Sequence, residues 1–180
     1  EQRKAVMVKL NPGSGLSTNP RLPLKSPRRM KGKIVPIANP QDWLDQGAAL
    51  LRDAQKLERS GGSNEGIFRN AYPSAELVVK AARCEHETGR KGHHLARPLG
   101  MLAQGRFGEE YLRLPGVAGN ANKLGTLITP DLLTLAKEVE AFWPPYMDAT
   151  HGPITKDAKD KTLRLAELVN RVLQPRSRAK

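Results

Sequence analysis

The feature that most constrains the fold is a helical spacing of apolar residues, which recurs in four segments between residues 39 and 173. In each segment the apolar residues stand three or four positions apart, so they line one face of an α-helix. Such helices bury their apolar faces against one another and form a bundle. The four sets are Trp43, Leu44, Ala48, Leu51, Ala54 and Leu57; Ala75, Val78, Val79 and Ala82; Leu132, Leu135, Ala136, Val139 and Phe142; and Ala158, Leu165, Leu168, Val169 and Val172.

Capping and breaking residues set the expected limits of the first two helices. Asn39 followed by Pro40 favours a helix start, because Asn accepts a hydrogen bond from the first turn and proline suits the first helical position. This helix is expected to run for about 17 residues, until the Ser-Gly-Gly-Ser turn at 60–63. The second is expected from about residue 72 to residue 88, with Pro73 in its first turn.

The remaining elements are shorter or begin with threonine. A short helix is expected over 94–104, and one turn over 109–112. Two further helices are predicted by Thr129, which precedes Pro130, and by Thr155, since threonine is a favourable N-cap. No internal segment reads convincingly as a strand. The predicted fold is therefore all-α: a bundle of four to five helices over 39–173, with an extended basic N-terminal arm (1–38) and a short basic C-terminal tail (174–180).

Positive charge is concentrated at the two ends of the chain. Residues 1–38 hold nine Lys or Arg and one acid, a balance of 9 − 1 = +8, and residues 174–180 add three cations and no acid. The formal net charge of +12 therefore leaves 12 − 8 − 3 = +1 for residues 39–173. A near-neutral body with two basic ends predicts a polyanionic partner that the ends contact.

The arm has the composition of an extended phosphate-binding segment. Its five prolines disfavour a packed element, and it contains no aromatic residue on which a base could stack. Contacts to the phosphate backbone, without sequence preference and with a steep dependence on salt, are therefore expected. The candidate nucleic-acid-binding residues are Arg21, Lys25, Arg28, Arg29, Lys31 and Lys33 in the arm and Arg176, Arg178 and Lys180 in the tail.

The middle of the chain resembles the HEPN superfamily, small helical-bundle domains of toxins, CRISPR nucleases and antiviral systems. The segment AELVVKAA at 75–82 leads to Gly92-His93-His94-Leu95, where the family has a turn of the type Gly-His-Asp-Leu. The helices expected at 129–146 and 155–173 are similar to later helices of that family. The resemblance covers about residues 40–173 and implies a helical domain that acts on or binds RNA.

The catalytic signature of that family is an Arg followed, after four to six residues, by a His, and this chain departs from it. Arg90 is separated from His94 by only three residues, and His151 has no arginine in the ten positions before it. The resemblance therefore implies a catalytically silent member. The alternative is a metal-independent ribonuclease that uses Arg90 and His94 as its catalytic pair.

No cofactor and no metal site is expected. Adjacent histidines, as at 93–94, do not present both rings to one ion from a helix, and no carboxylate cluster suited to magnesium stands out. The single cysteine, Cys84, excludes an internal disulfide and favours a reducing compartment. We expect a cytoplasmic protein that does not bind membranes, and an organellar matrix or a virion stays open as an alternative. The chain begins at Glu1 and not at Met, so a transit peptide before it could have been removed.

The sequence thus predicts a non-enzymatic nucleic-acid-binding protein that is a subunit of a larger ribonucleoprotein or defence complex. Its expected partners are nucleic acid, with RNA favoured over DNA, and other protein subunits; a homodimer stays open. Two alternatives remain at this point. One is the ribonuclease just described, and the other is a phage DNA-packaging or virion protein whose basic ends contact the genome.

Overall fold

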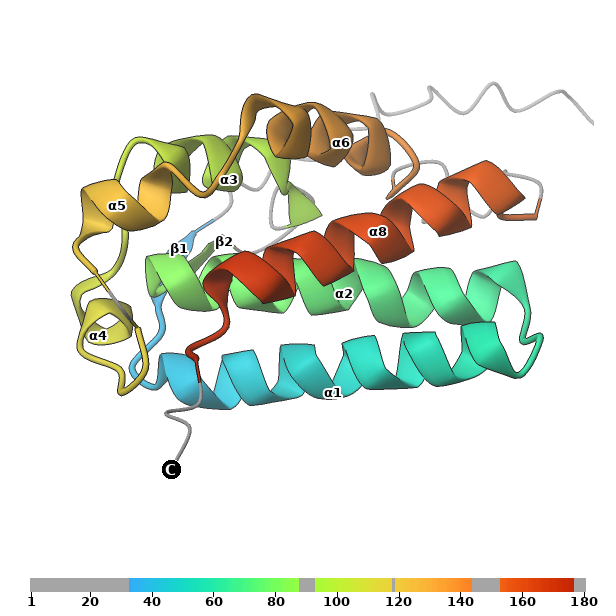
Figure 1. The fold of residues 1–180 in the computed structure, drawn as a ribbon, viewed down its shortest axis with the longest axis horizontal. Helices are drawn as coiled ribbons and strands as arrows, with labels where there is room; N and C mark the ends of the chain where they lie inside the picture. Colours follow the sequence, from blue (N-terminus) through green and yellow to red (C-terminus); the bar gives the residue numbers. More distant parts are fainter. Residues whose placement is uncertain (1–32, 88–92, 118, 144–152, 177–180) are drawn as a thin grey trace, which may run out of the picture. The chain divides into compact units, whose positions relative to one another are not determined.

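The computed structural model describes residues 33–87, 93–117, 119–143 and 153–176 of the chain. Residues 1–32, which hold most of the basic arm, lie outside the described residues. The described part is mostly helical, as predicted, with one small sheet (Figure 1). Its elements are β1 (Ile34–Pro36), α1 (Pro40–Arg59), α2 (Asn64–Arg83), β2 (Glu85–Glu87), α3 (Ala96–Ala103), α4 (Glu109–Leu112), α5 (Ala121–Gly125), α6 (Pro130–Glu140) and α8 (Lys156–Leu173).

The long helices α1 and α2 form an antiparallel pair (Figure 1) and approach each other closely at Gly47. A Cβ atom on Gly47 would lie 2.7 Å from the side chain of Val78 and 3.1 Å from the carbonyl of Ser74, so glycine permits this approach. Leu44, Ala54 and Val78 are fully buried between the helices. The pair thus forms the base of the core, as the apolar spacing predicted.

Helix α8 packs on both α1 and α2, and buried polar side chains link the three helices. The amide of Asn170 donates to the Ser74 hydroxyl over 3.0 Å, and that hydroxyl donates to the carbonyl of Gly47 over 2.7 Å. At the far end of the packing, the Lys159 ammonium lies 2.8 Å from both carboxylate oxygens of Glu58. Because buried polar groups are costly unless paired, these bonds favour one alignment of the three helices.

Helix α3 packs on α2, α6 packs on both α3 and α8, and α5 packs on α3 (Figure 1). Thr129 caps α6 as predicted, with its hydroxyl accepting from the N–H of Leu132 over 3.3 Å, and Thr155 caps α8 by accepting from Ala158 over 3.1 Å. The single turn expected over 109–112 is present as α4. The short helix expected over 94–104 is α3, which begins two residues later than predicted.

The expected start of the second helix was wrong. Helix α2 begins at Asn64, where Ser63 caps it by accepting from the N–H of Gly66 over 3.1 Å, and Pro73 lies inside the helix instead of in its first turn. The helix ends at Arg83, before the predicted residue 88, because Cys84 adopts a left-handed conformation with φ of 53°. Tertiary packing outweighs the cost of the internal proline, since the residues around it are fully buried.

The expectation of no internal strand was also wrong in one place. β1 pairs antiparallel with β2, with Ile34 opposite Glu87 and Pro36 opposite Glu85. The N–H of Ile37 then donates to the carbonyl of Cys84 over 2.8 Å, and the Ile37 side chain is buried. Residues 34–37, which the sequence assigned to the extended arm, therefore pack on the helical body. None of the described helices is long and apolar enough to cross a membrane.

Candidate functional site

Only two of the nine candidate nucleic-acid-binding residues lie in the part of the chain that the structure describes. Lys33 is exposed directly before β1, and Arg176 is exposed three residues after the end of α8. The others, Arg21, Lys25, Arg28, Arg29, Lys31, Arg178 and Lys180, lie outside the described residues. The structure therefore fixes where the arm and the tail join the body.

The C-terminal tail joins the body beside the start of α1. The side-chain amide of Gln174 donates to the carbonyl of Leu44 over 2.8 Å, and the N–H of Arg176 donates to the carbonyl of Gly116 over 3.0 Å. Gly116 has a φ of 87°, and a Cβ there would lie 2.3 Å from the carbonyl oxygen of Arg176. The chain is thus held up to Arg176 before the tail continues.

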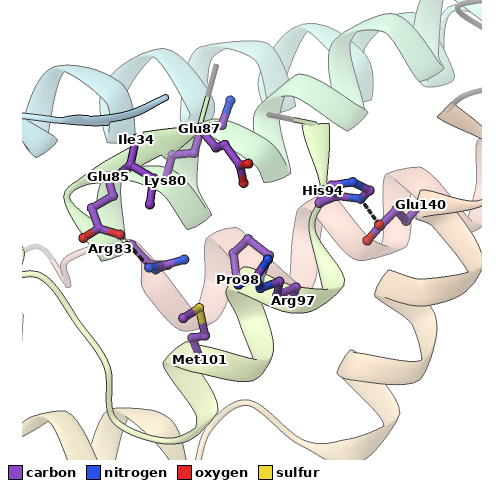
Figure 2. Close-up of a pocket in the computed structure, with 10 residues that line it drawn as sticks. All are labelled: Ile34, Lys80, Arg83, Glu85, Glu87, His94, Arg97, Pro98, Met101 and Glu140. Atoms are coloured by element: carbon purple, nitrogen blue, oxygen red, sulfur yellow. Dashed lines mark hydrogen bonds and ion pairs between the residues drawn. The ribbon is translucent and has the colours of Figure 1, made fainter. Parts of the chain in front are cut away.

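His94, the candidate catalytic histidine, is fixed by a carboxylate from a distant helix. Its Nδ1 atom lies within hydrogen-bonding distance of Glu140 Oε1, at the end of α6 (Figure 2). The other oxygen of Glu140 accepts from the N–H groups of Leu95 (3.2 Å) and Ala96 (2.9 Å) at the start of α3. The Glu140 carboxylate therefore stabilises the N-terminus of α3 with one oxygen and orients the His94 imidazole with the other.

His93 is held by a second carboxylate. Its Nδ1 lies 3.1 Å from Glu76 Oε2, and Glu76 also forms an ion pair with Lys80, one turn further along α2. The His93 carbonyl accepts from the hydroxyl of Tyr72, whose ring stacks on Trp143 at 4.2 Å between centroids. The two histidines therefore belong to one network that joins α2, α3 and α6.

A hollow of about 370 Å³ opens beside His94, between α3 and the α2–β2 corner (Figure 2). Arg83, at the end of α2, and Arg97, on α3, both line it, and Arg83 forms an ion pair with Glu85 at 2.6 Å. A second hollow, of about 360 Å³, shares His94 and Glu140 and is lined by Lys137 and Trp143. The two hollows are thus lined by the oriented histidines together with basic side chains and acidic side chains in similar number, so they carry no strong net charge. Arg90, the other half of the candidate catalytic pair, lies outside the described residues.

Glu76 and Glu140 were missed by sequence reasoning. For Glu76 the sequence offered a signal, because this acid interrupts an apolar helical face. The structure shows that Glu76 is buried, with 7 % of its surface exposed. An acid in such a position needs a hydrogen-bonding partner, and the polar residues after the helix, among them His93 and His94, could supply one. Glu140 gave no such signal, since only the packing of α6 against α3 brings it to His94.

Two lysines of the last helix are ion-paired instead of free for phosphate. Lys159 is buried between Glu58 and Asp160, and Lys161 pairs with Glu138 and Asp157. Hydrogen bonds to these carboxylates raise the pKa of both lysines. Lys156 is exposed at the start of the helix. In the described part of the chain, no group of three or more His, Cys, Asp or Glu side chains is arranged to hold a metal ion.

Two buried tyrosines and the buried cysteine predict a loss of stability at high pH, because each can lose a proton there. Burial raises the pKa of the Tyr72 and Tyr111 phenols and of the Cys84 thiol; at Tyr72 the nearby Glu76 and Glu140 add to this effect. The unfolded chain loses these protons near its ordinary pKa values, about 8.5 for Cys and about 10 for Tyr, while the folded chain keeps them. Stability should therefore be constant below about pH 8 with respect to these groups and fall as pH rises further.

The measurement is the urea midpoint at about pH 7.5, 9 and 10.5, with tyrosinate absorbance followed in the folded protein. The midpoint should fall with pH, and it should fall less steeply in Tyr72→Phe. Native absorbance showing that Tyr72 and Tyr111 ionise with ordinary pKa values would contradict the burial that the structure describes.

No family model, no curated protein and no solved structure matches this chain.

Proposed function

We propose that this chain is a non-enzymatic nucleic-acid-binding protein, with RNA favoured, whose basic arm and tail contact the phosphate backbone as part of a larger complex. The observation that carries the proposal is the division of charge: +8 on residues 1–38 and +3 on residues 174–180, against +1 on the residues between. Lys or Arg side chains that neutralise phosphates release bound counterions, and this gives affinity without sequence recognition.

Three aromatic residues of the body are too deeply buried to stack on a base. Phe68, Tyr72 and Tyr111 are almost completely buried, and Trp143 stacks on Tyr72. Base stacking requires an accessible ring face, and the arm contains no aromatic residue. An extended basic segment joined to a compact helical body suits a strand of nucleic acid that runs between neighbouring subunits.

The test is to identify the nucleic acid that copurifies with the full chain at low salt. The proposal expects absorbance at 260 nm that ribonuclease removes, and release of the nucleic acid by high salt. Digestion by deoxyribonuclease alone would favour the phage packaging alternative. A chain that purifies free of nucleic acid and does not bind added RNA or DNA at low salt would contradict the proposal.

The His94–Glu140 pair favours one second candidate, the metal-independent ribonuclease. A carboxylate that orients an imidazole leaves the other ring nitrogen available as a general base, which could activate a ribose hydroxyl. Incubation of RNA with the protein, with and without chelator, separates the two functions. Cleavage that persists with chelator and disappears in His94→Ala, while RNA binding is retained, would establish the ribonuclease. We expect binding without cleavage.

A further inference from the structure

Four exposed arginines lie along the contact between α1 and α8, which we call the α1–α8 seam. They are Arg52 and Arg59 on α1 and Arg164 and Arg171 on α8. The two helices run antiparallel, since Gln174 bonds to Leu44 at one end and Lys159 bonds to Glu58 at the other. Figure 1 shows α1, α2 and α8 extending together along the body.

A hydrogen bond across the seam fixes where these arginines lie. The amide of Gln55 donates to Glu167 Oε1 over 2.9 Å, so these two residues face each other. Arg52 and Arg59 stand three and four positions from Gln55, on the same side of α1, and Arg164 and Arg171 stand three and four positions from Glu167 on α8. With a rise of about 1.5 Å per residue, the arginines within each helix are about 10 Å apart.

The antiparallel direction places one arginine of each helix on either side of that bond. Arg52 and Arg171 lie toward the end where the tail leaves, and Arg59 and Arg164 lie toward the other end. None of the four forms an ion pair with another residue of the described ranges, 33–87, 93–117, 119–143 and 153–176. Neighbouring side chains of like charge repel each other, and an anion that binds between them relieves this repulsion.

The acids of the seam are already engaged by other side chains. Glu58 and Asp160 both contact Lys159, and Glu167 accepts from Gln55. Asp45, which shares the outer side of α1 with Arg52, accepts from Gln41 over 2.8 Å. Glu58 and Asp160 are paired with Lys159, and Glu167 and Asp45 accept from neutral amides; none of these four carboxylates bonds to a seam arginine, so the arginines retain their donors. Guanidinium groups bind phosphate through two parallel hydrogen bonds, so phosphate is the anion that this arrangement fits best.

We infer that the α1–α8 seam is a second phosphate-binding surface, on which the nucleic acid held by the basic tail continues across the body. This inference rests on the proposed function and adds a fixed surface to it. The tail leaves the body at the end of the seam that is nearer to Arg52 and Arg171, because Gln174 bonds to Leu44 and Arg176 bonds to Gly116 there. The described seam carries no aromatic residue at these positions, so its contacts are to phosphates and independent of sequence.

The test compares three full-length variants with the unaltered chain, using a fluorescein-labelled 20-nucleotide oligouridylate and anisotropy between about 50 and 200 mM salt. The seam variant carries Arg52→Gln, Arg59→Gln, Arg164→Gln and Arg171→Gln. A matched control changes four exposed cations elsewhere, Arg69, Arg106, Arg113 and Lys123, to Gln and so has the same net charge. The tail variant carries Arg176→Gln, Arg178→Gln and Lys180→Gln.

The seam variant should bind at least about tenfold more weakly, and its slope of log affinity against log salt should shrink by up to about 3, at roughly 0.7 per lost phosphate contact. The control should change much less. The single variants Arg52→Gln and Arg171→Gln, each losing roughly 0.7 of slope, give the same answer if the fourfold variant does not fold. Equal effects of seam and control variants, or an unchanged seam variant beside a weakened tail variant, would overturn the inference and leave the proposed function standing. No binding by the unaltered chain would overturn both.

Discussion

Gly108→Ala should destabilise the body by about 3 kcal/mol or more. Gly108 is in contact with the C-terminal end of α2, where its N–H donates to the carbonyl of Ala82 over 2.9 Å. A Cβ atom there would lie 2.3 Å from the Cys84 sulfur, 2.4 Å from the Cys84 Cβ and 2.8 Å from the carbonyl of Arg83. Cys84 has little freedom to move, since it is buried and its sulfur accepts from the N–H of Tyr111 over 3.3 Å.

Thermal denaturation followed by circular dichroism measures this effect, which should lower Tm by about 10 °C for a chain of this size. Gly100→Ala is the matched control, because a Cβ at Gly100 meets no atom within 4 Å and the residue lies inside α3. That change should leave Tm unaltered or raise it slightly, since alanine favours helix over glycine by up to about 1 kcal/mol. Equal Tm values for the two variants would contradict the packing of Cys84 against Gly108.

Replacing Arg28, Arg29, Lys31 and Lys33 with Gln should weaken the binding of every nucleic acid by a similar factor, about 100-fold at 150 mM salt. The reason is the loss of four phosphate contacts, each of which contributes through counterion release and not through base recognition. The measurement is anisotropy with two unrelated single-stranded RNAs and one duplex DNA. Lys33 adjoins β1, so circular dichroism of the variant should first show an unchanged helical body.

A matched control for the arm keeps its charge and changes its order, by exchanging Arg28 with Lys31 and Arg29 with Lys33. Phosphate contacts that depend on charge alone should survive this exchange almost unchanged. If the neutralised variant bound as tightly as the original chain, the arm would not be the binding element. A variant that lost affinity for one RNA only would point to sequence recognition, which the proposed function does not include.

The helical part of the fold could be predicted because its signals are local. The apolar spacing identified α1, α6 and α8, and the caps at Thr129 and Thr155 fixed two starts to within a residue. The sequence failed where a local signal competes with tertiary packing. Pro73 looked like a helix start but lies inside α2, and Ser63, the actual cap, was taken as part of a turn.

The small sheet could not be predicted from local signals. β1 and β2 are three residues each and lie about fifty positions apart, and the β2 sequence Glu-His-Glu has no strand character of its own. It pairs because the left-handed Cys84 turns the chain back at the end of α2. The same limit applies to the site, where His94 was a candidate from sequence but its partner, Glu140, comes from another helix.

The most direct test of the proposed function is the salt dependence of binding by the unaltered full-length chain. Log affinity for a labelled 20-nucleotide RNA is measured between about 50 and 200 mM salt and repeated with an RNA of the same length and unrelated sequence. We expect a linear decrease with a slope of about −5 or steeper, for at least seven neutralised phosphates at roughly 0.7 each, and affinities that agree within about threefold. A slope near zero, or a strong preference for one sequence, would contradict the account.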